Sequence, residues 1–346
     1  MRSNLTAVVF EATEEDKLGG RYRMWYLYFD SIKGQNGYQT ALATSDDLVN
    51  WSFNKGGDDG IIFKRNDLPG SYDYGGVTMG CGFWESSNLT SRRRLRDNRA
   101  AAAASQTSAP AHKYYALYGC YPSRGGYEAG DGGEGIAWSD DGVEWHRESA
   151  TVGVLSGGKS PAAAKWESHV VYQPNVVISG ETVYDFYNAA GVNEYGKNAE
   201  ETGFATLPLS AIPGIDHAAN KSLWHRDPRS PVIASGPPGS CDTAMASDPK
   251  IFWDEEQQVW VNFYFGLGDG THGHADILVA FSKDLVKWDK DERPLYRAGG
   301  HPDGIDAQHA HKISIIYDDK GVGYLYYTAV GPKGRGIALL TSKPLQ

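Results

Sequence analysis

The sequence lacks the features that would place the protein in several specialised classes. It has no run of 18 uninterrupted apolar residues in its 346, so no membrane-spanning helix and no membrane partner are expected. Only three cysteines occur, Cys81, Cys120 and Cys241, too few and too scattered for a disulfide scaffold or a zinc site. We expect them to be buried small apolar residues, with a disulfide between Cys81 and Cys120 left open.

Positive charge is also scarce relative to negative charge. Lys and Arg number 33 against 43 Asp and Glu, giving a net charge of −10. Such a surface repels phosphate backbones, so nucleic acid is not an expected partner. The first residues do not resemble a secretory signal either, because Glu11, Glu14 and Glu15 lie where its apolar segment would be. Localisation stays unknown, with secretion expected if the natural protein has an upstream segment.

What the sequence does contain is an internal repeat. An alternating aromatic segment begins at residues 24, 113, 182, 259 and 323. A second segment follows each of these, with clear copies at 41–51, 135–145 and 278–288 and weaker ones from 203 and 336. The clear copies combine a strand, a Ser-x-Asp turn and a Trp. Three to four short strands recurring about every 70 residues predict an all-β fold, a five-bladed β-propeller.

We expect residues 1–346 to form this propeller as a single domain. The predicted blades cover roughly residues 4–60, 72–150, 166–232, 245–295 and 308–346. Residues 86–112 have no apolar face to bury and are predicted to be a disordered insertion in blade two. Two stacked β-sandwiches are the competing architecture, but sandwiches do not repeat one motif at this interval.

The resemblance to a known family rests on motifs spread over all five blades. Asp248-Pro249 opens a strand, an aromatic run follows, and residues 282–288 read Ser-Lys-Asp-Leu-Val-Lys-Trp. This pattern resembles the five-bladed furanosidase superfamily, which contains glycoside hydrolase families 43 and 32. Within it the sequence is most similar to an uncharacterised hydrolase branch with the stretches seen here at 75–78, 298–302 and 310–314.

The resemblance implies a glycosidase of carbohydrate metabolism that works with carboxyl groups in a central funnel. It implies that Asp248 orients the sugar and tunes the pKa of the acid. We assign Glu167 as the general acid, because it lies just ahead of an inner strand and has a long side chain. We assign Asp73, flanked by Tyr72 and Tyr74, as the base or nucleophile.

Substrate-binding side chains are expected around these carboxyl groups, as faces for sugar rings or as partners for hydroxyls. The expected set is Tyr72, Asp30, Gln173, Asn175, Asn188, His274 and His311. No cofactor is implied, although a central calcium ion or a water could lie near His311. The ligand-like cluster Asp269, His272, His274 and Asp276 lacks a standard zinc spacing, and we expect it at the substrate entrance.

Other functions stay open because blade one departs from the family pattern. In family 43 the basic aspartate opens the inner strand of blade one, yet this sequence holds no acid before Glu11. The base has moved to Asp73, or an upstream segment is missing, or the protein is a non-catalytic carbohydrate-binding propeller.

A glycosyl phosphorylase on the same fold is a further alternative, and it would need basic residues in the funnel. Strand alternation predicts that Lys250 and Lys312 turn away from Asp248 and His311. We therefore expect a monomeric, exo-acting hydrolase of a furanoside or related glycan, with an oligo- or polysaccharide as substrate.

Overall fold

The computed structural model describes residues 2–12, 19–30, 37–53, 60–85, 112–124, 131–148, 155–156, 164–211, 224–269 and 273–344. Regular structure in these ranges is β-strand, apart from two single 3-10 turns, Lys165–Glu167 (η4) and Leu209–Ala211 (η5). No helix in these ranges has the length and apolar character needed to cross a membrane. Residues 86–111 of the predicted insertion lie outside the described residues.

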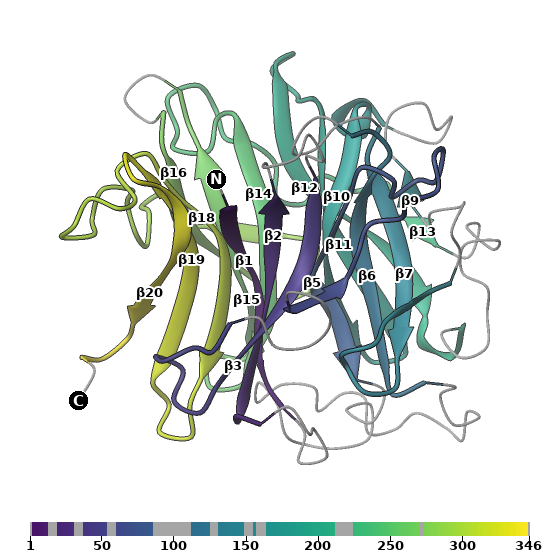
Figure 1. Cartoon of the computed structure of the whole chain (residues 1–346). Coiled ribbons are helices and arrows are strands. Elements are labelled where there is room, and N and C mark those ends of the chain that lie inside the picture. The colour runs from purple at the N-terminus through teal and green to yellow at the C-terminus, as the bar shows by residue number, and fades with distance from the viewer. Residues whose placement is uncertain are drawn as a thin grey trace.

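The strands form five antiparallel units, which confirms the predicted five-bladed β-propeller (Figure 1). Blade one is β1 Arg2–Glu11, β2 Tyr22–Asp30, β3 Tyr38–Ser45 and β4 Ile61–Phe63; blade two is β5 Gly76–Glu85, β6 Tyr114–Tyr121, β7 Gly133–Ser139, β8 His146–Arg147 and the short β9 Leu155–Ser156. Blade three is β10 Val170–Ser179, β11 Thr182–Val192, β12 Asn198–Pro208 and β13 His225–Arg226; blade four is β14 Met245–Asp254, β15 Val259–Leu267, β16 Ala275–Ser282 and β17 Trp288–Lys290; blade five is β18 His309–Tyr317, β19 Gly323–Gly331 and β20 Gly334–Thr341.

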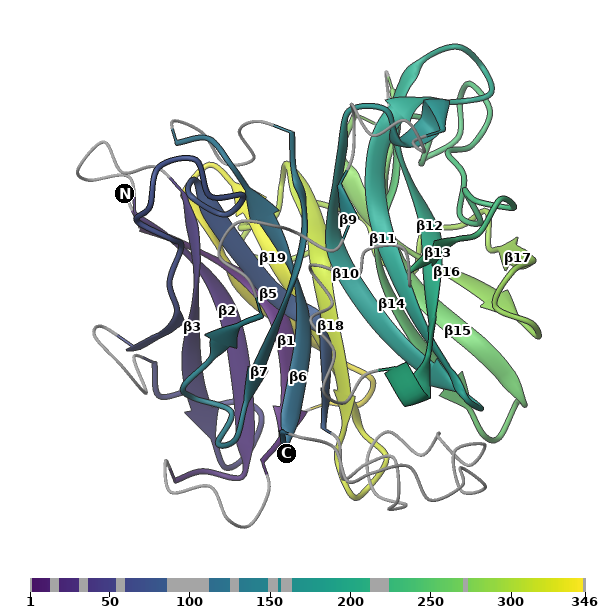
Figure 2. The same ribbon diagram turned by 90° about the vertical axis from the view of Figure 1, so that its right-hand side faces the viewer.

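The first strand of each blade lies at the centre of the molecule. Neighbouring inner strands contact one another in the cyclic order β1, β5, β10, β14, β18 and back to β1. Figure 2 shows β1 and β18, from opposite ends of the sequence, side by side. There Val9 N donates a hydrogen bond to Ser314 Oγ at 2.9 Å, and the Tyr326 hydroxyl donates to the carbonyl oxygen of Leu48. The ring is thus closed by contacts between the first and last blades.

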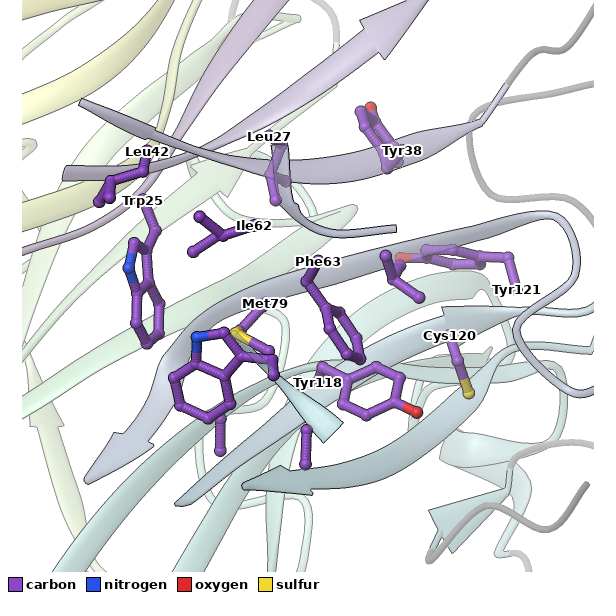
Figure 3. Packing of buried hydrophobic residues seen from close by; sticks show 14 of the residues in the cluster. Trp25, Leu27, Tyr38, Leu42, Ile62, Phe63, Met79, Tyr118, Cys120 and Tyr121 are labelled. Atoms are coloured by element: carbon purple, nitrogen blue, oxygen red, sulfur yellow. The ribbon is translucent and has the colours of Figure 1, made fainter. Parts of the chain in front are cut away.

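The interfaces between blades are apolar and largely aromatic. Between blades one and two, Phe63 packs edge-to-face on Tyr118 with ring centroids 4.8 Å apart (Figure 3). Every residue of β6 is buried, because successive side chains of a strand face the two neighbouring blades in turn. The repeated aromatic segments therefore supply the packing between blades. Cys120 lies in this core as a free thiol, and the side chain of Cys81 lies outside the described residues.

The predicted Ser-x-Asp turns occur at the ends of three third strands. Asp284 Oδ1 accepts hydrogen bonds from two backbone amides, Val286 N at 2.9 Å and Lys287 N at 2.8 Å. Ser282 Oγ accepts from Leu285 N at 2.9 Å. The residue after the aspartate has a positive φ in all three turns, at Leu48, Gly142 and Leu285. Local side-chain bonding therefore explains the motif.

Candidate functional site

The inner strands of blades three, four and five share one backbone irregularity. Each contains a β-bulge, and a residue inside it has a positive φ: 58° at Gln173, 61° at Asp248 and 50° at Lys312. This conformation costs roughly 1–2 kcal/mol for a residue with a Cβ. Bulges re-aim side chains and are enriched next to active sites. We call Gln173, Asp248 and Lys312 the bulge row. These three residues form the candidate site.

Proline helps to fix two of these bulges. Pro174 follows Gln173 and Pro249 follows Asp248. Proline has no N–H, so it cannot donate a ladder hydrogen bond at that point of an inner strand. The Gln-Pro and Asp-Pro pairs are therefore sequence signals for the irregularity. The third bulge, at Lys312, is followed by Ile313 and carries no such signal.

Asp248 is the most buried member of the bulge row, with 2% of its surface exposed. Its Oδ1 accepts a hydrogen bond from Lys250 Nζ at 2.8 Å, and its backbone N donates to Asn188 Oδ1 at 2.7 Å. The prediction that Lys250 turns away from Asp248 is wrong, because the extra residue of the bulge interrupts the alternation on which it depended. No donor among the described residues contacts Asp248 Oδ2.

Glu200 in β12 is a carboxyl group that sequence reasoning missed. Its Oε2 accepts a hydrogen bond from Ser247 Oγ at 3.0 Å, and Ser247 directly precedes Asp248. Glu200 is partly exposed. A parallel bridge between Glu200 and Met245 joins blades three and four at this point. No local motif marks Glu200, and only this contact between blades brings it next to the bulge row.

The other two predicted catalytic carboxyl groups lie in separate ion pairs with arginines of outer strands. Glu167 Oε2 lies 2.8 Å from Arg226 Nη1 of β13 and accepts from the Tyr187 hydroxyl at 2.9 Å. Asp73 Oδ2 accepts from Arg147 Nε of β8 at 2.5 Å. Burial raises the pKa of Asp73, although Arg147 opposes this.

The three predicted carboxyl groups are not brought together in the part of the protein that the structure describes. Neither Glu167 nor Asp73 shares a hydrogen bond or ion pair with Asp248 there. To act as acid or base, Glu167 or Asp73 would have to leave a largely buried arginine without its partner, which is costly. Their catalytic roles stay predictions, and the ion pairs weigh against them.

The predicted amide side chains have two different placements. Asn175 Oδ1 accepts from Ile251 N at 3.1 Å, and Asn188 Oδ1 accepts from Asp248 N, so both bind blade three to the inner strand of blade four. Gln173 is a member of the bulge row, and its Nε2 is buried without a partner among the described residues. Asn188 Nδ2 is also buried without a partner among the described residues, but Gln173 is partly exposed and is therefore the amide that best fits ligand binding.

The remaining predicted binding residues are dispersed. The Tyr72 hydroxyl lies 2.5 Å from the Tyr118 hydroxyl in blade two. His274 is exposed at the start of β16. The side chain of Asp30 and the whole of His272 lie outside the described residues.

His311 lies beside the bulge at Lys312 and pairs with a second histidine. The ring centroids of His309 and His311 are 5.9 Å apart, and Phe265 packs edge-to-face on His311 at 5.5 Å. Burial lowers the pKa of both histidines, and the nearby Arg335 guanidinium adds to the effect.

The surroundings of His311 do not fit a calcium ion. Calcium takes six to eight oxygen ligands, most often from carboxylates and carbonyls. The charged groups that act on His311 are Lys312, His309 and Arg335, all of them basic. Across the described ranges, no group of three or more His, Cys, Asp or Glu side chains could hold a metal ion.

Comparison with known proteins shows likeness in structure only. No protein-family model and no curated protein matches the sequence. The protein is similar to BT0996 in its complex with RGII, with a TM-score of 0.71 and 23% identity over 99% of this protein and 88% of BT0996. It is also similar to Zg3597, a family 117 glycoside hydrolase of the marine bacterium Zobellia galactanivorans, with a TM-score of 0.56 and 14% identity over 98% and 84%.

A third match is a structure of the GH130 family of mannoside phosphorylases, which contains glycoside hydrolases that target β-1,2 mannosidic linkages in Candida mannan. Its TM-score is 0.57, at 12% identity over 99% of this protein and 86% of the matched one. At these identities the matches show the fold: a five-bladed β-propeller shared with glycoside hydrolases and phosphorylases.

Proposed function

We propose that the protein cleaves glycosidic bonds at the bulge row, with Asp248 at the centre of the site. The observation that carries this proposal is the positive φ of three non-glycine residues at matching bulges of adjacent inner strands. Strained backbone persists only where the surrounding fold holds it in place, and it clusters at functional sites. The matched structures support the proposal, because glycoside hydrolases and mannoside phosphorylases share this fold.

In this scheme Asp248 and Glu200 supply the two carboxyl groups that glycoside cleavage needs. Lys250 holds Asp248 Oδ1, which leaves Oδ2 to act as the base that takes the proton of the attacking water. Glu200 is the more exposed of the two and would transfer the proton to the leaving oxygen, held in place by Ser247. Gln173 Nε2 adds a donor for a further hydroxyl. Asp73 and Glu167 are the alternative carboxyl groups.

We further propose that a glycan enters end-on, as an exo-acting enzyme requires, and that a furanoside or a related glycan is the substrate class. The motifs that resemble families 43 and 32 favour a furanoside. A glycan as substrate is supported by the structural match to BT0996, whose structure is a complex with RGII.

The test measures sugar release from aryl furanosides and from plant and fungal polysaccharides. We expect turnover by the native protein and a loss of about 100-fold or more in Asp248→Asn and in Glu200→Gln. Glu256→Gln is the matched control, because Glu256 is exposed at the hairpin that ends β14. Circular dichroism checks that each variant folds. Equal activity in the native protein and Asp248→Asn would overturn the assignment of the site.

Phosphorolysis is a second candidate, favoured by the burial of Lys250 and Lys312 at two of the bulges. The same assay is therefore run with and without inorganic phosphate. Release that requires phosphate would identify a phosphorylase. Binding of a glycan without release under either condition would identify a carbohydrate-binding propeller and contradict cleavage.

A further inference from the structure

We propose that His309 and His311, together with Arg335, form a receptor for an oxyanion, such as the carboxylate of an acidic sugar. The role of this receptor in recognising a glycan rests on the proposed function. The receptor itself is argued from the contacts of blade five.

Strand pairing places the basic side chains on one face of blade five. His309 in β18 lies opposite Val330 in β19, and Val330 lies opposite Arg335 in β20. Side chains of directly opposed residues stand on the same face of a sheet. His311 follows two residues after His309, and their rings lie 5.9 Å apart. The group therefore sits at the starts of β18 and β20, next to the bulge at Lys312.

The hydrogen bond of His309 fixes which ring nitrogen can donate. Ala275 N donates to His309 Nδ1 at 3.1 Å, so this nitrogen must carry a lone pair. A neutral imidazole has one proton, which therefore lies on Nε2 of His309. No acceptor among the described residues contacts His309 Nε2, and the residue is partly exposed. His309 thus presents an N–H donor to a ligand.

His311 holds a polar atom whose hydrogen bond is missing. Its Nε2 is buried and has no partner among the described residues. A buried polar group left in this state costs about 1–3 kcal/mol. A ligand oxygen that reaches the two rings would complete this bond. An oxyanion carries several acceptor oxygens, so it can contact both histidines and the Arg335 guanidinium together.

The charged groups that shift the pKa values of the two histidines are all basic. Those that act on His309 are Arg335 and His274, and those that act on His311 are Lys312, His309 and Arg335. Asp276 lies on the neighbouring strand β16, but its Oδ1 accepts from Ala298 N at 2.8 Å. This local excess of basic groups contrasts with the net charge of −10 of the whole protein. It favours an anion over a cation as the ligand.

Binding of an anion should be coupled to proton uptake. In the free protein, burial and the neighbouring basic groups lower the pKa of both histidines. A bound negative charge favours the protonated ring of His311 and raises its pKa again, whereas His309 keeps its lone pair for Ala275 N. At a pH near the lowered pKa of His311, each anion bound should therefore bring part of a proton with it.

The experiment is an NMR titration of the histidine rings against pH. The probes are galacturonate, galactose and inorganic phosphate. We expect galacturonate to raise the pKa of His311 by about 1 or more. Galactose, which has the same ring without the carboxylate, should leave this pKa unchanged. The response should fall at least tenfold in apparent affinity in Arg335→Gln, a substitution at an exposed position. His225→Gln, at an exposed position on β13, is the matched control.

The probes distinguish a sugar carboxylate from free phosphate as the source of the oxyanion. A response to phosphate alone would keep the receptor and assign it to a free phosphate. Equal responses to galacturonate and galactose, or no response to any probe, would overturn the proposal. The titration is repeated with Asp248→Asn. A histidine response that persists there would show that the receptor does not depend on the cleavage site. A response in a native protein that cleaves no glycan would uphold the receptor while the proposed cleavage fails.

Discussion

Lys250 Nζ and Asp248 Oδ1 lie 2.8 Å apart in the inner strand of blade four, and both side chains are almost fully buried. The ion pair connects Asp248, the residue with a positive φ in the bulge, to Lys250, which follows the bulge in β14. Removing one partner of a buried ion pair typically costs about 3–5 kcal/mol, because the other charge is left alone.

We therefore expect Lys250→Met to lower the free energy of unfolding by about 3 kcal/mol or more. The double variant Asp248→Asn with Lys250→Met should regain much of this loss, because no isolated charge remains. Urea denaturation of the native protein, both single variants and the double variant measures the coupling. If the two single effects simply add, the ion pair does not stabilise the bulge.

The ion pair of Glu167 with Arg226 distinguishes a structural from a catalytic carboxyl group. If Glu167 is structural, Glu167→Gln should lower the free energy of unfolding by about 1–3 kcal/mol and leave kcat nearly unchanged. If it is the general acid, kcat should fall about 100-fold or more and the alkaline limb of the pH profile should change. Tyr187→Phe, which removes only the 2.9 Å hydrogen bond to Glu167, is the control for packing.

Glu134 and Asp185 predict how stability depends on pH. Both are 0% exposed, and they act on each other across the interface of blades two and three. Burial raises the pKa of both carboxyl groups, and Asp185 raises that of Glu134 further, while Arg226 opposes this. The folded state thus holds more protons than the unfolded polypeptide near neutral pH. Their stabilising contribution is complete below the unfolded pKa of about 4 and is lost as pH rises through the folded values.

The free energy of unfolding should accordingly decline from about pH 5 toward pH 9, and Asp185→Asn should reduce this decline by about 1 kcal/mol or more. Glu144→Gln, an exposed position on the same blade as Glu134, should leave the slope unchanged. Calorimetry across this pH range makes the comparison. If the stability of Asp185→Asn declines with pH as steeply as that of the native protein, the Glu134–Asp185 pair is not the group that binds the extra proton in the folded state.

The Ser-x-Asp turns predict the opposite dependence on pH, a loss of stability as the pH falls. Backbone N–H groups of Lys287 and Val286 lower the pKa of Asp284. Its contribution is present above the unfolded pKa and is lost as pH falls through the lower folded value. Asp284→Asn should cost about 1 kcal/mol at pH 7 and little at pH 2, as measured by thermal unfolding. Asp289→Asn, at an exposed position in β17, should show no such convergence with the native protein.

The sequence by itself determined the repeating part of the protein. The aromatic segments became strands because a blade buries both of its faces, and this requirement is written into each repeat. The Ser-x-Asp turns were equally readable, because all of their hydrogen bonds lie within a few residues. Asp248 also stood out from its neighbours, because the Asp-Pro pair that opens a strand resembles the family pattern.

Only the tertiary structure decided which side chains meet. Glu167 and Asp73 pair with arginines on outer strands that follow them by 59 and 74 residues, a pairing that no local pattern encodes. Glu200 reaches the strand of Asp248 through a bridge between two blades, and His309 lies on the same face as Arg335 across a third strand. Local bonding fixes strands and turns, whereas the partners of a buried charge depend on how the blades are packed around the ring, and long-range contacts alone set that arrangement.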